Sequence, residues 1–182
     1  MKTVKSNLKI EAERIVDNLG LITMLSKYGH TEIVGSVALD LIVKKDIDIH
    51  VFLESGDFLK IVNEVSNELI EKPEIDEVRI SDWREIRSMK ISVDDFKSDS
   101  GLWDIEIWLT KSKDSCGFDF LDKLRRELTK PKRKIIMDLK QHFYDKGLLK
   151  DSMSRQIYLA VVDHGITTLD EFYKYLESQK DD

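Results

Sequence analysis

Residues 33 to 53 read I-V-G-S-V-A-L-D-L-I-V-K-K-D-I-D-I-H-V-F-L. A short apolar run ends at Gly35 and Ser36, and an alternating segment begins at Asp46. In an extended strand alternate side chains share a face, so Asp46 and Asp48 are predicted to point one way and the isoleucines beside them into a core. Two neighbouring carboxylates repel each other unless a cation lies between them, and Mg²⁺ prefers oxygen ligands of this kind.

The Gly-Ser corner favours a functional interpretation of this acidic pair. Two acids on one strand are most often simply the solvent-exposed face of that strand. Gly35, however, lets backbone N–H groups approach a phosphate closely, and Ser36 adds a hydroxyl donor. A strand, a Gly-Ser corner, a short helix and a strand with two acids would place phosphate donors and metal ligands at the same edge of a sheet.

This unit resembles the signature of the polymerase-beta-like nucleotidyltransferase superfamily. That pattern has an apolar residue, Gly, then Gly or Ser, a spacer, and Asp-apolar-Asp/Glu-apolar; residues 34–36 and 46–49 match it at every defined position. The resemblance covers only residues 33–50. It implies an α+β fold, with a small mixed sheet of the nucleotidyltransferase type and a C-terminal helical bundle, and it implies a third carboxylate on a later strand.

The candidates for the third carboxylate lie in residues 102–109, L-W-D-I-E-I-W-L. Strict alternation puts Asp104 and Glu106 on one face of this strand. The resemblance implies that one of them completes the metal site and acts as the catalytic acid or base. We expect Asp104 in that role, with Glu106 as the alternative. Simple solvation of the strand by both acids is the competing interpretation.

Periodicity predicts the other elements and a division into two regions. A nucleotidyltransferase-like α+β domain is expected over residues 1–110, and a helical region that closes the cleft over 111–182. A hairpin connector is expected from Asp94 to Gly101. The predicted helices are 6–28, 37–43, 58–70, 118–128, 132–145, 152–162 and one capped by Thr168, and the predicted strands are 31–34, 46–53, 77–80, 89–93 and 102–109.

Composition indicates a globular protein of the cytoplasm. The chain has 182 residues, of which 41% are hydrophobic and 35% charged, and no apolar run approaches a membrane span. Charged residues interrupt the apolar residues at the N-terminus, so no secretory signal is expected. The single Cys116 excludes an internal disulfide and fits a reducing compartment.

Charge is unevenly distributed along the chain. The net charge is −6, but residues 111–150 hold twelve Lys or Arg and six Asp or Glu, which leaves −12 for the remainder. This indicates a local anion site rather than a general nucleic-acid binder. Lys45 in the turn before the acidic pair, and Lys123, Arg126 and Lys134 in the helical region, are the predicted phosphate contacts. Most of these lysines would otherwise be a solvated helix face.

The resemblance implies Mg²⁺-dependent transfer of a nucleoside monophosphate from an NTP to a hydroxyl. Two Mg²⁺ ions are expected, and the NTP is the donor substrate. The implied roles are metal binding for Asp46, Asp48 and Asp104, catalysis for Asp104 or Glu106, and triphosphate binding for Gly35 and Ser36.

The acceptor and the partners are less constrained. Small bacterial members, such as the enzymes that modify aminoglycoside or lincosamide antibiotics, favour a small-molecule acceptor. An acidic chain disfavours nucleic acid, since phosphate neutralisation drives that binding. Neither a membrane partner nor a fixed oligomeric state is implied, and a homodimer that builds the cleft stays open. The alternatives are a binding module of the same fold, such as an antitoxin-type partner or a modifier of protein hydroxyls, and a chance match.

Overall fold

The computed structural model describes residues 6–150 and 152–179. Contacts divide the chain into a sheet unit, Met1–Leu121, and a helical unit, Asp122–Asp182, whereas the sequence analysis drew the division at residue 110. The elements up to the sheet's last strand are α1 (Asn7–Asn18), α2 (Leu21–Leu25), β1 (His30–Val34), α3 (Gly35–Leu39), β2 (Asp46–Phe52), α4 (Phe58–Ile70), β3 (Arg79–Trp83), the 3-10 turn η1 (Arg84–Ile86), β4 (Ser88–Ser98) and β5 (Gly101–Thr110). The helices after β5 are α5 (Phe118–Glu127), α6 (Lys130–Asp145), α7 (Met153–Asp163) and α8 (Leu169–Ser178).

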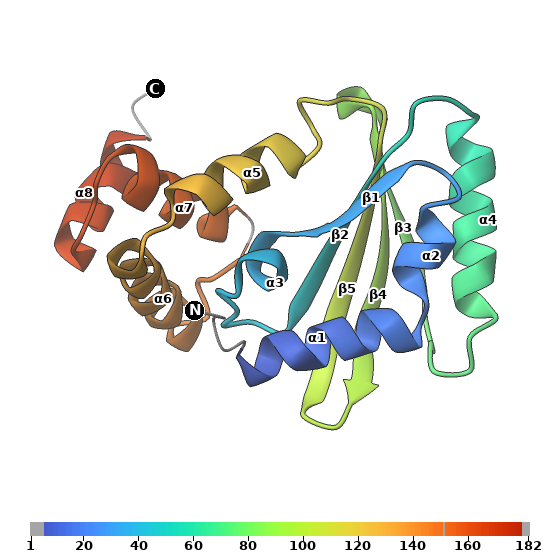
Figure 1. Cartoon of the computed structure of the whole chain (residues 1–182), viewed down its shortest axis with the longest axis horizontal. Coiled ribbons are helices and arrows are strands. Elements are labelled where there is room, and N and C mark those ends of the chain that lie inside the picture. The colour runs from blue at the N-terminus through green and yellow to red at the C-terminus, as the bar shows by residue number, and fades with distance from the viewer. Residues whose placement is uncertain (1–5, 151, 180–182) are drawn as a thin grey trace. The chain divides into compact units, whose positions relative to one another are not determined.

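The sheet has five strands in the order β1-β2-β5-β4-β3 (Figure 1). The pair β2–β5 is parallel, and the other three pairs are antiparallel. Alternation on β2 and β5 buries one set of apolar side chains almost completely against α1, α2 and α4, which form one core with that face of the sheet; the set is Ile47, Ile49, Val51, Ile105, Ile107 and Leu109. The polar side chains of the same strands therefore share the opposite face.

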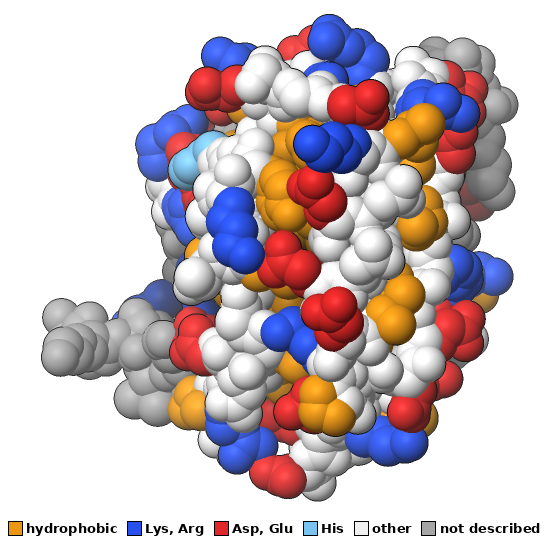
Figure 2. Space-filling view, turned by 90° about the vertical axis from the view of Figure 1, so that its right-hand side faces the viewer, with side chains coloured by type: hydrophobic (Ala, Val, Ile, Leu, Met, Phe, Trp, Pro, Cys, Tyr) orange, Lys and Arg blue, Asp and Glu red, His pale blue; other side chains and the backbone are white. Residues whose placement is uncertain are grey.

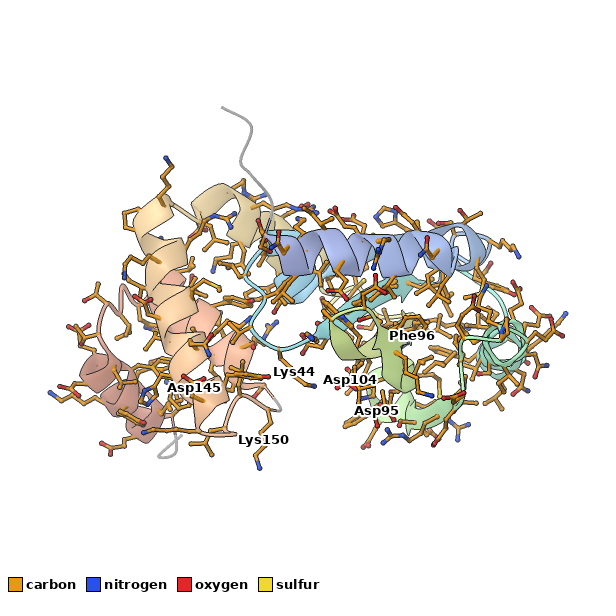
Figure 3. The ribbon with its side chains drawn as sticks, turned by 90° about the horizontal axis from the view of Figure 1, so that it is seen from below. Lys44, Asp95, Phe96, Asp104, Asp145 and Lys150 are labelled. Atoms are coloured by element: carbon orange, nitrogen blue, oxygen red, sulfur yellow. The ribbon has the colours of Figure 1, made fainter. Side chains whose placement is uncertain are left out.

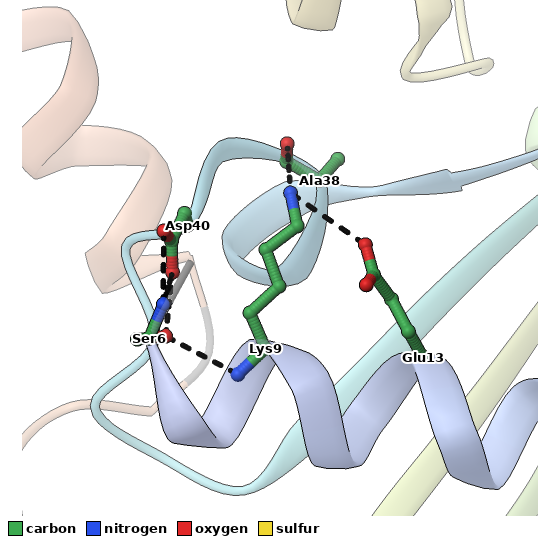
Figure 4. A network of polar contacts seen from close by, with 5 residues as sticks. All are labelled: Ser6, Lys9, Glu13, Ala38 and Asp40. Carbon is green, nitrogen blue, oxygen red and sulfur yellow. Dashed lines mark hydrogen bonds and ion pairs between the residues drawn. The ribbon is translucent and has the colours of Figure 1, made fainter. Parts of the chain in front are cut away.

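The single helix predicted for residues 6–28 is divided at Gly20. This residue has φ 60°, in the left-handed region, and separates α1 from α2. Ser6 caps α1 as expected, since its hydroxyl accepts a hydrogen bond from the N–H of Lys9. The same hydroxyl donates to Asp40, 2.5 Å away, at the end of α3, and Lys9 reaches the carbonyl of Ala38 (Figure 4). Asp40 is thus a structural residue that joins α1 to α3.

The prediction of a connector from Asp94 to Gly101 is wrong. β4 continues to Ser98, and only Asp99 and Ser100 separate it from β5. The pairing of β4 with β5 is irregular between Val93 and Phe96, and Asp95 has φ 55° there. A bulge of this kind lets a strand pass residues with low β propensity without losing its partner.

The helical unit has its own buried residues. α6 begins at Lys130 with Pro131 in its first turn, which is the position that a helix tolerates for proline. α8 carries the predicted capping box of Thr168 and Glu171. The interior of the helical unit contains a fully buried lysine, Lys140 on α6, whose ammonium donates to the hydroxyl of Tyr158 at 3.2 Å.

Charges of both signs are interspersed on the side of the molecule that carries α4, with hydrophobic side chains visible between them (Figure 2). Within residues 6–150 and 152–179, none of the helices combines the length and the apolar character that spanning a membrane requires. The free Cys116 is buried, and burial raises the pKa of its thiol to about 11.

Candidate active site

The parallel pairing of β2 and β5 brings the predicted carboxylates together. Asp46 is the register partner of Asp104, and Asp48 is the register partner of Glu106. The isoleucines between the acids are buried on the core side, with Ile47 at 0% exposure. All four acids therefore project from the other face of two strands that lie roughly 4.8 Å apart. The two sequence segments that were selected separately form one acidic cluster.

The Gly-Ser corner lies directly against this cluster. Val34 pairs with Asp48, and Gly35 follows with φ +62°. A Cβ atom on Gly35 would lie 2.8 Å from Oδ2 of Asp48, so no other residue leaves that carboxylate in place. Ser36 is buried in α3. This helix starts at Gly35 rather than at residue 37 and ends at Leu39, because Asp40 adopts a left-handed conformation, φ 55°.

Lys44 supplies a positive charge to the acids. Its Nζ lies 2.9 Å from Oδ2 of Asp104 and 3.9 Å from Oδ2 of Asp46 (Figure 3). Burial alone would lower the pKa of this ammonium, but its hydrogen bond to Asp104 and the charge of Asp46 raise the pKa above the ordinary value. Lys45 instead donates to the carbonyl of Ser100 in the β4–β5 turn. The lysine that reaches the acids is therefore the neighbour of the one predicted.

Asp104 and Glu106 have different surroundings. Glu106 is held on both oxygens from within the sheet: Lys90 on β4 donates to Oε1 at 2.9 Å, and the indole N–H of Trp108 donates to Oε2 at 3.4 Å. Asp104 accepts the weaker backbone hydrogen bond of Asp95 at 3.4 Å in addition to Lys44. Its principal partner thus comes from a turn, whereas the partners of Glu106 come from strands.

Lys90 and Trp108 are site residues that the sequence analysis did not find. Each belongs to a predicted strand, and each lies on the polar side of its alternation. Trp108 reaches Glu106 within β5, whereas the contact of Lys90 with Glu106 depends on the β4–β5 register. The alternation of each strand therefore placed these side chains on the polar face, but it did not show that they contact Glu106.

The donor set fits Mg²⁺ in its chemistry. Asp46, Asp48 and Asp104 offer hard carboxylate oxygens on one face, the ligands that this ion uses together with substrate phosphates. Among the described residues, however, no group of three or more acidic, histidine or cysteine side chains is gathered closely enough to hold a metal ion. Lys44 forms an ion pair with Asp104 in this arrangement, so its charge opposes metal binding there.

His50 lies beside the acids as an uncharged ring. Burial lowers the pKa of this histidine to about 4, although the charge of Glu106 acts in the opposite direction. The backbone N–H of Gly117 donates to Nδ1 at 2.9 Å, which requires that nitrogen to be unprotonated. His50 therefore contributes a neutral imidazole with its proton on Nε2 at neutral pH.

The three basic residues predicted in the helical region belong to the helical unit. Lys123 makes an ion pair with Asp163 at 2.5 Å, and Lys134 makes one with Asp138 on its own helix at 2.6 Å. Arg126 is exposed in the last turn of α5. The acids belong to the sheet unit, so contact between these residues and the phosphates of a donor stays a prediction.

No protein-family model matches this chain, and no curated protein matches it significantly.

Solved structures do match in fold. One is described as a cytoplasmic RNA terminal U-transferase, with a TM-score of 0.61, 18% identity, and coverage of 84% of this chain and 47% of that one. A second is the Cid1 poly(U) polymerase with MgGTP bound, with a TM-score of 0.64, 17% identity, and coverage of 86% and 50%. A third is the polymerase core of TRAMP, an RNA surveillance complex, with a TM-score of 0.60, 20% identity, and coverage of 87% and 50%.

This chain spans about half the length of each of these polymerases. The descriptions of the first and third name RNA, that of the second names a poly(U) polymerase, and none of the three is described as acting on a small molecule. The comparisons therefore do not support the expected small-molecule acceptor. They also do not support the expectation that nucleic acid is not a partner. The predicted fold class is confirmed: the chain adopts the α+β fold of the polymerase-beta-like nucleotidyltransferases.

Proposed function

We propose that this protein transfers a nucleoside monophosphate from an NTP to a hydroxyl group, in a reaction that depends on Mg²⁺. The observation that carries the proposal is the register of Asp46 with Asp104, beside an Asp48 whose carboxylate lies against Gly35. The proposal is supported by the position of the three acids on one face of adjacent strands, with the Gly-Ser corner beside Asp48.

In the proposed reaction the acceptor oxygen attacks the α-phosphorus of the NTP. The new bond joins that oxygen to phosphorus, the bond to the bridging oxygen of the β-phosphate breaks, and pyrophosphate leaves. Asp104 accepts the proton of the acceptor hydroxyl. When bound, Mg²⁺ would stabilise the negative charge on the attacking and leaving oxygens.

The remaining roles follow from position. Asp46 and Asp48 bind the metal, together with Asp104. Gly35 and Ser36 contact the triphosphate through the backbone and the serine hydroxyl. We assign the base to Asp104 rather than to Glu106, because Lys90 and Trp108 already hold both oxygens of Glu106 within the sheet.

Two classes of acceptor are candidates for the proposed transfer. The net charge of −6 favours a small cationic molecule, as the sequence analysis expects. The descriptions of the three structural neighbours favour the end of an RNA strand.

The first experiment measures the melting temperature with each NTP, in Mg²⁺ and in EDTA. A ligand that binds only the folded state raises the apparent stability. We expect stabilisation by at least one NTP that requires Mg²⁺ and is lost in Asp48→Asn. Asp114→Asn, which changes an exposed loop acid by the same chemistry, is the matched control and should retain the shift.

A wild-type protein that no NTP stabilises in Mg²⁺ would contradict the proposal. A shift that survives in Asp48→Asn would place the nucleotide elsewhere. The first outcome would direct attention to the alternative of a binding module, tested by co-purification of a protein partner.

A further inference from the structure

Five aromatic rings form a continuous row beside the acids. Their centroids follow one another at 4.8, 6.5, 6.3 and 5.9 Å, and neighbouring rings are tilted by 44° to 78°. All five side chains belong to the sheet unit. We call this set the aromatic row; its members in order are His30, Phe118, His50, Trp108 and Trp83.

The aromatic row is attached to the candidate active site at two points. His50 follows Asp48 by two residues on β2, and Trp108 follows Glu106 by two residues on β5, so both rings share the face of the acids. The indole N–H of Trp108 also donates to Glu106. The row therefore lies one step of the strand alternation beyond the carboxylates.

Core packing does not explain the outer end of the row. Trp83, at the end of the edge strand β3, keeps 41% of its surface exposed, whereas Trp103 on β5 has 0% exposed. Lys90 places its ammonium 5.4 Å from the ring centre of Trp108. An accessible tryptophan with a second tryptophan behind it resembles a surface for a flat ligand more than a protein interior.

The strand order places this end of the row on the acceptor side of the site. The Gly-Ser corner follows β1, on one side of the acidic strands β2 and β5. Trp83 lies on β3, on the other side. A triphosphate at Gly35 and a base at Trp83 would thus lie on opposite sides of the acidic strands.

We infer that the aromatic row, with Trp83 at its accessible end, stacks the terminal bases of a single-stranded nucleic acid whose end hydroxyl is the acceptor. This inference rests on the proposed function and specifies its acceptor. Stacking on aromatic rings binds single strands with little dependence on sequence, since every base has a flat face.

The test measures binding of a short, fluorescently labelled single-stranded oligoadenylate without NTP. Trp83→Ala should weaken binding about 5- to 150-fold, the range expected for the loss of one stacked base. Trp83→Tyr should restore most of the affinity, and Trp83→Leu, which keeps an apolar side chain without a ring, should not. The matched control is Ile80→Ala, which removes an exposed apolar side chain from the opposite face of the same strand and should bind normally.

A second oligonucleotide, with the same ribose-phosphate backbone but no bases, separates the contribution of base stacking to binding from that of the backbone charge. Normal binding of the abasic strand, equal binding by wild type and Trp83→Ala, or no binding of either strand would overturn the inference. The melting shift with NTP and Mg²⁺ is recorded on the same samples. A shift retained in Trp83→Ala shows that the fold and donor site are intact, and a shift absent from the wild type counts against the proposed function rather than against the row.

Discussion

Lys44 places its ammonium 2.9 Å from the carboxylate of Asp104, so the chain supplies its own cation to the strand pair that we propose as a metal site. The positive charge of the lysine repels a divalent ion at the same carboxylate. The side chain of Lys44 is 44% exposed and leaves from a turn, so it has a route away from the acids. Metal binding and the Lys44–Asp104 ion pair should therefore compete.

Lys44→Met tests this competition. We expect the concentration of Mn²⁺ or Mg²⁺ needed for half-maximal binding to fall about two- to fivefold without NTP, as an exposed ion pair contributes roughly 0.2–1 kcal/mol. Calorimetric titration of the metal alone measures it. Lys45→Met removes the same charge from a side chain that bonds Ser100 instead. Equal affinities in wild type and Lys44→Met would refute the competition.

Asp104→Asn and Glu106→Gln distinguish the two candidates for the third carboxylate. Loss of a general base slows a reaction by about 10²- to 10⁴-fold, so Asp104→Asn should lower NTP-dependent pyrophosphate release by this factor. Glu106→Gln should have a smaller effect, because its carboxylate is engaged by Lys90 and Trp108. The reverse order of the two variants would reassign the base to Glu106.

Gly35→Ala should affect both stability and the site. A left-handed conformation costs a non-glycine residue roughly 1–2 kcal/mol, and denaturant unfolding should show at least this loss. Its Cβ would also displace the carboxylate of Asp48, so stabilisation by NTP and Mg²⁺ should disappear. Gly20 has nearly the same φ, +60°, with no atom near its missing Cβ. Gly20→Ala should therefore lose similar stability but still be stabilised by NTP and Mg²⁺. Nucleotide binding by Gly35→Ala would contradict the proposed role of the Gly-Ser corner.

The stability of the protein should depend on the protonation of His50. Burial lowers its pKa from 6.5 to about 4, so between these two pH values unfolding allows the ring to take up a proton. Its contribution is fully present above pH 6.5 and is lost as the pH falls toward 4, by about 3 kcal/mol in all. Denaturant unfolding of wild type and His50→Gln across this range isolates the histidine. Parallel pH curves for the two proteins would show that His50 is not the group responsible.

The local signature carried most of what the sequence could predict. Two acids on alternate positions and a Gly-Ser corner require only nearby residues to be recognised, and strict alternation likewise placed Asp104 and Glu106 on one face. The error at the β4–β5 hairpin has a local cause as well. Asp94 and Asp95 have low strand propensity, but an irregularity in pairing carries β4 past them.

The remaining site contacts depend on strand order, which periodicity does not encode. Lys90 meets Glu106 only because β4 is the neighbour of β5, and Trp83 meets Trp108 only because β3 follows at the edge. The choice between Lys44 and Lys45 depends on the conformation of a turn. None of these contacts has a pattern within a single segment.

The parallel pairing of β2 and β5 also bears on how the protein is made. A nascent chain that has been synthesised only as far as β4 already contains Asp46 and Asp48, but it lacks the strand that separates β2 from β4 in the finished sheet. β5 forms a local hairpin with β4, whereas its parallel pairing with β2 joins distant parts of the chain and forms slowly. If the acids bind Mg²⁺ as proposed, acquisition of Mg²⁺ affinity would mark the moment when β5 pairs with β2, and it would report on folding on the ribosome.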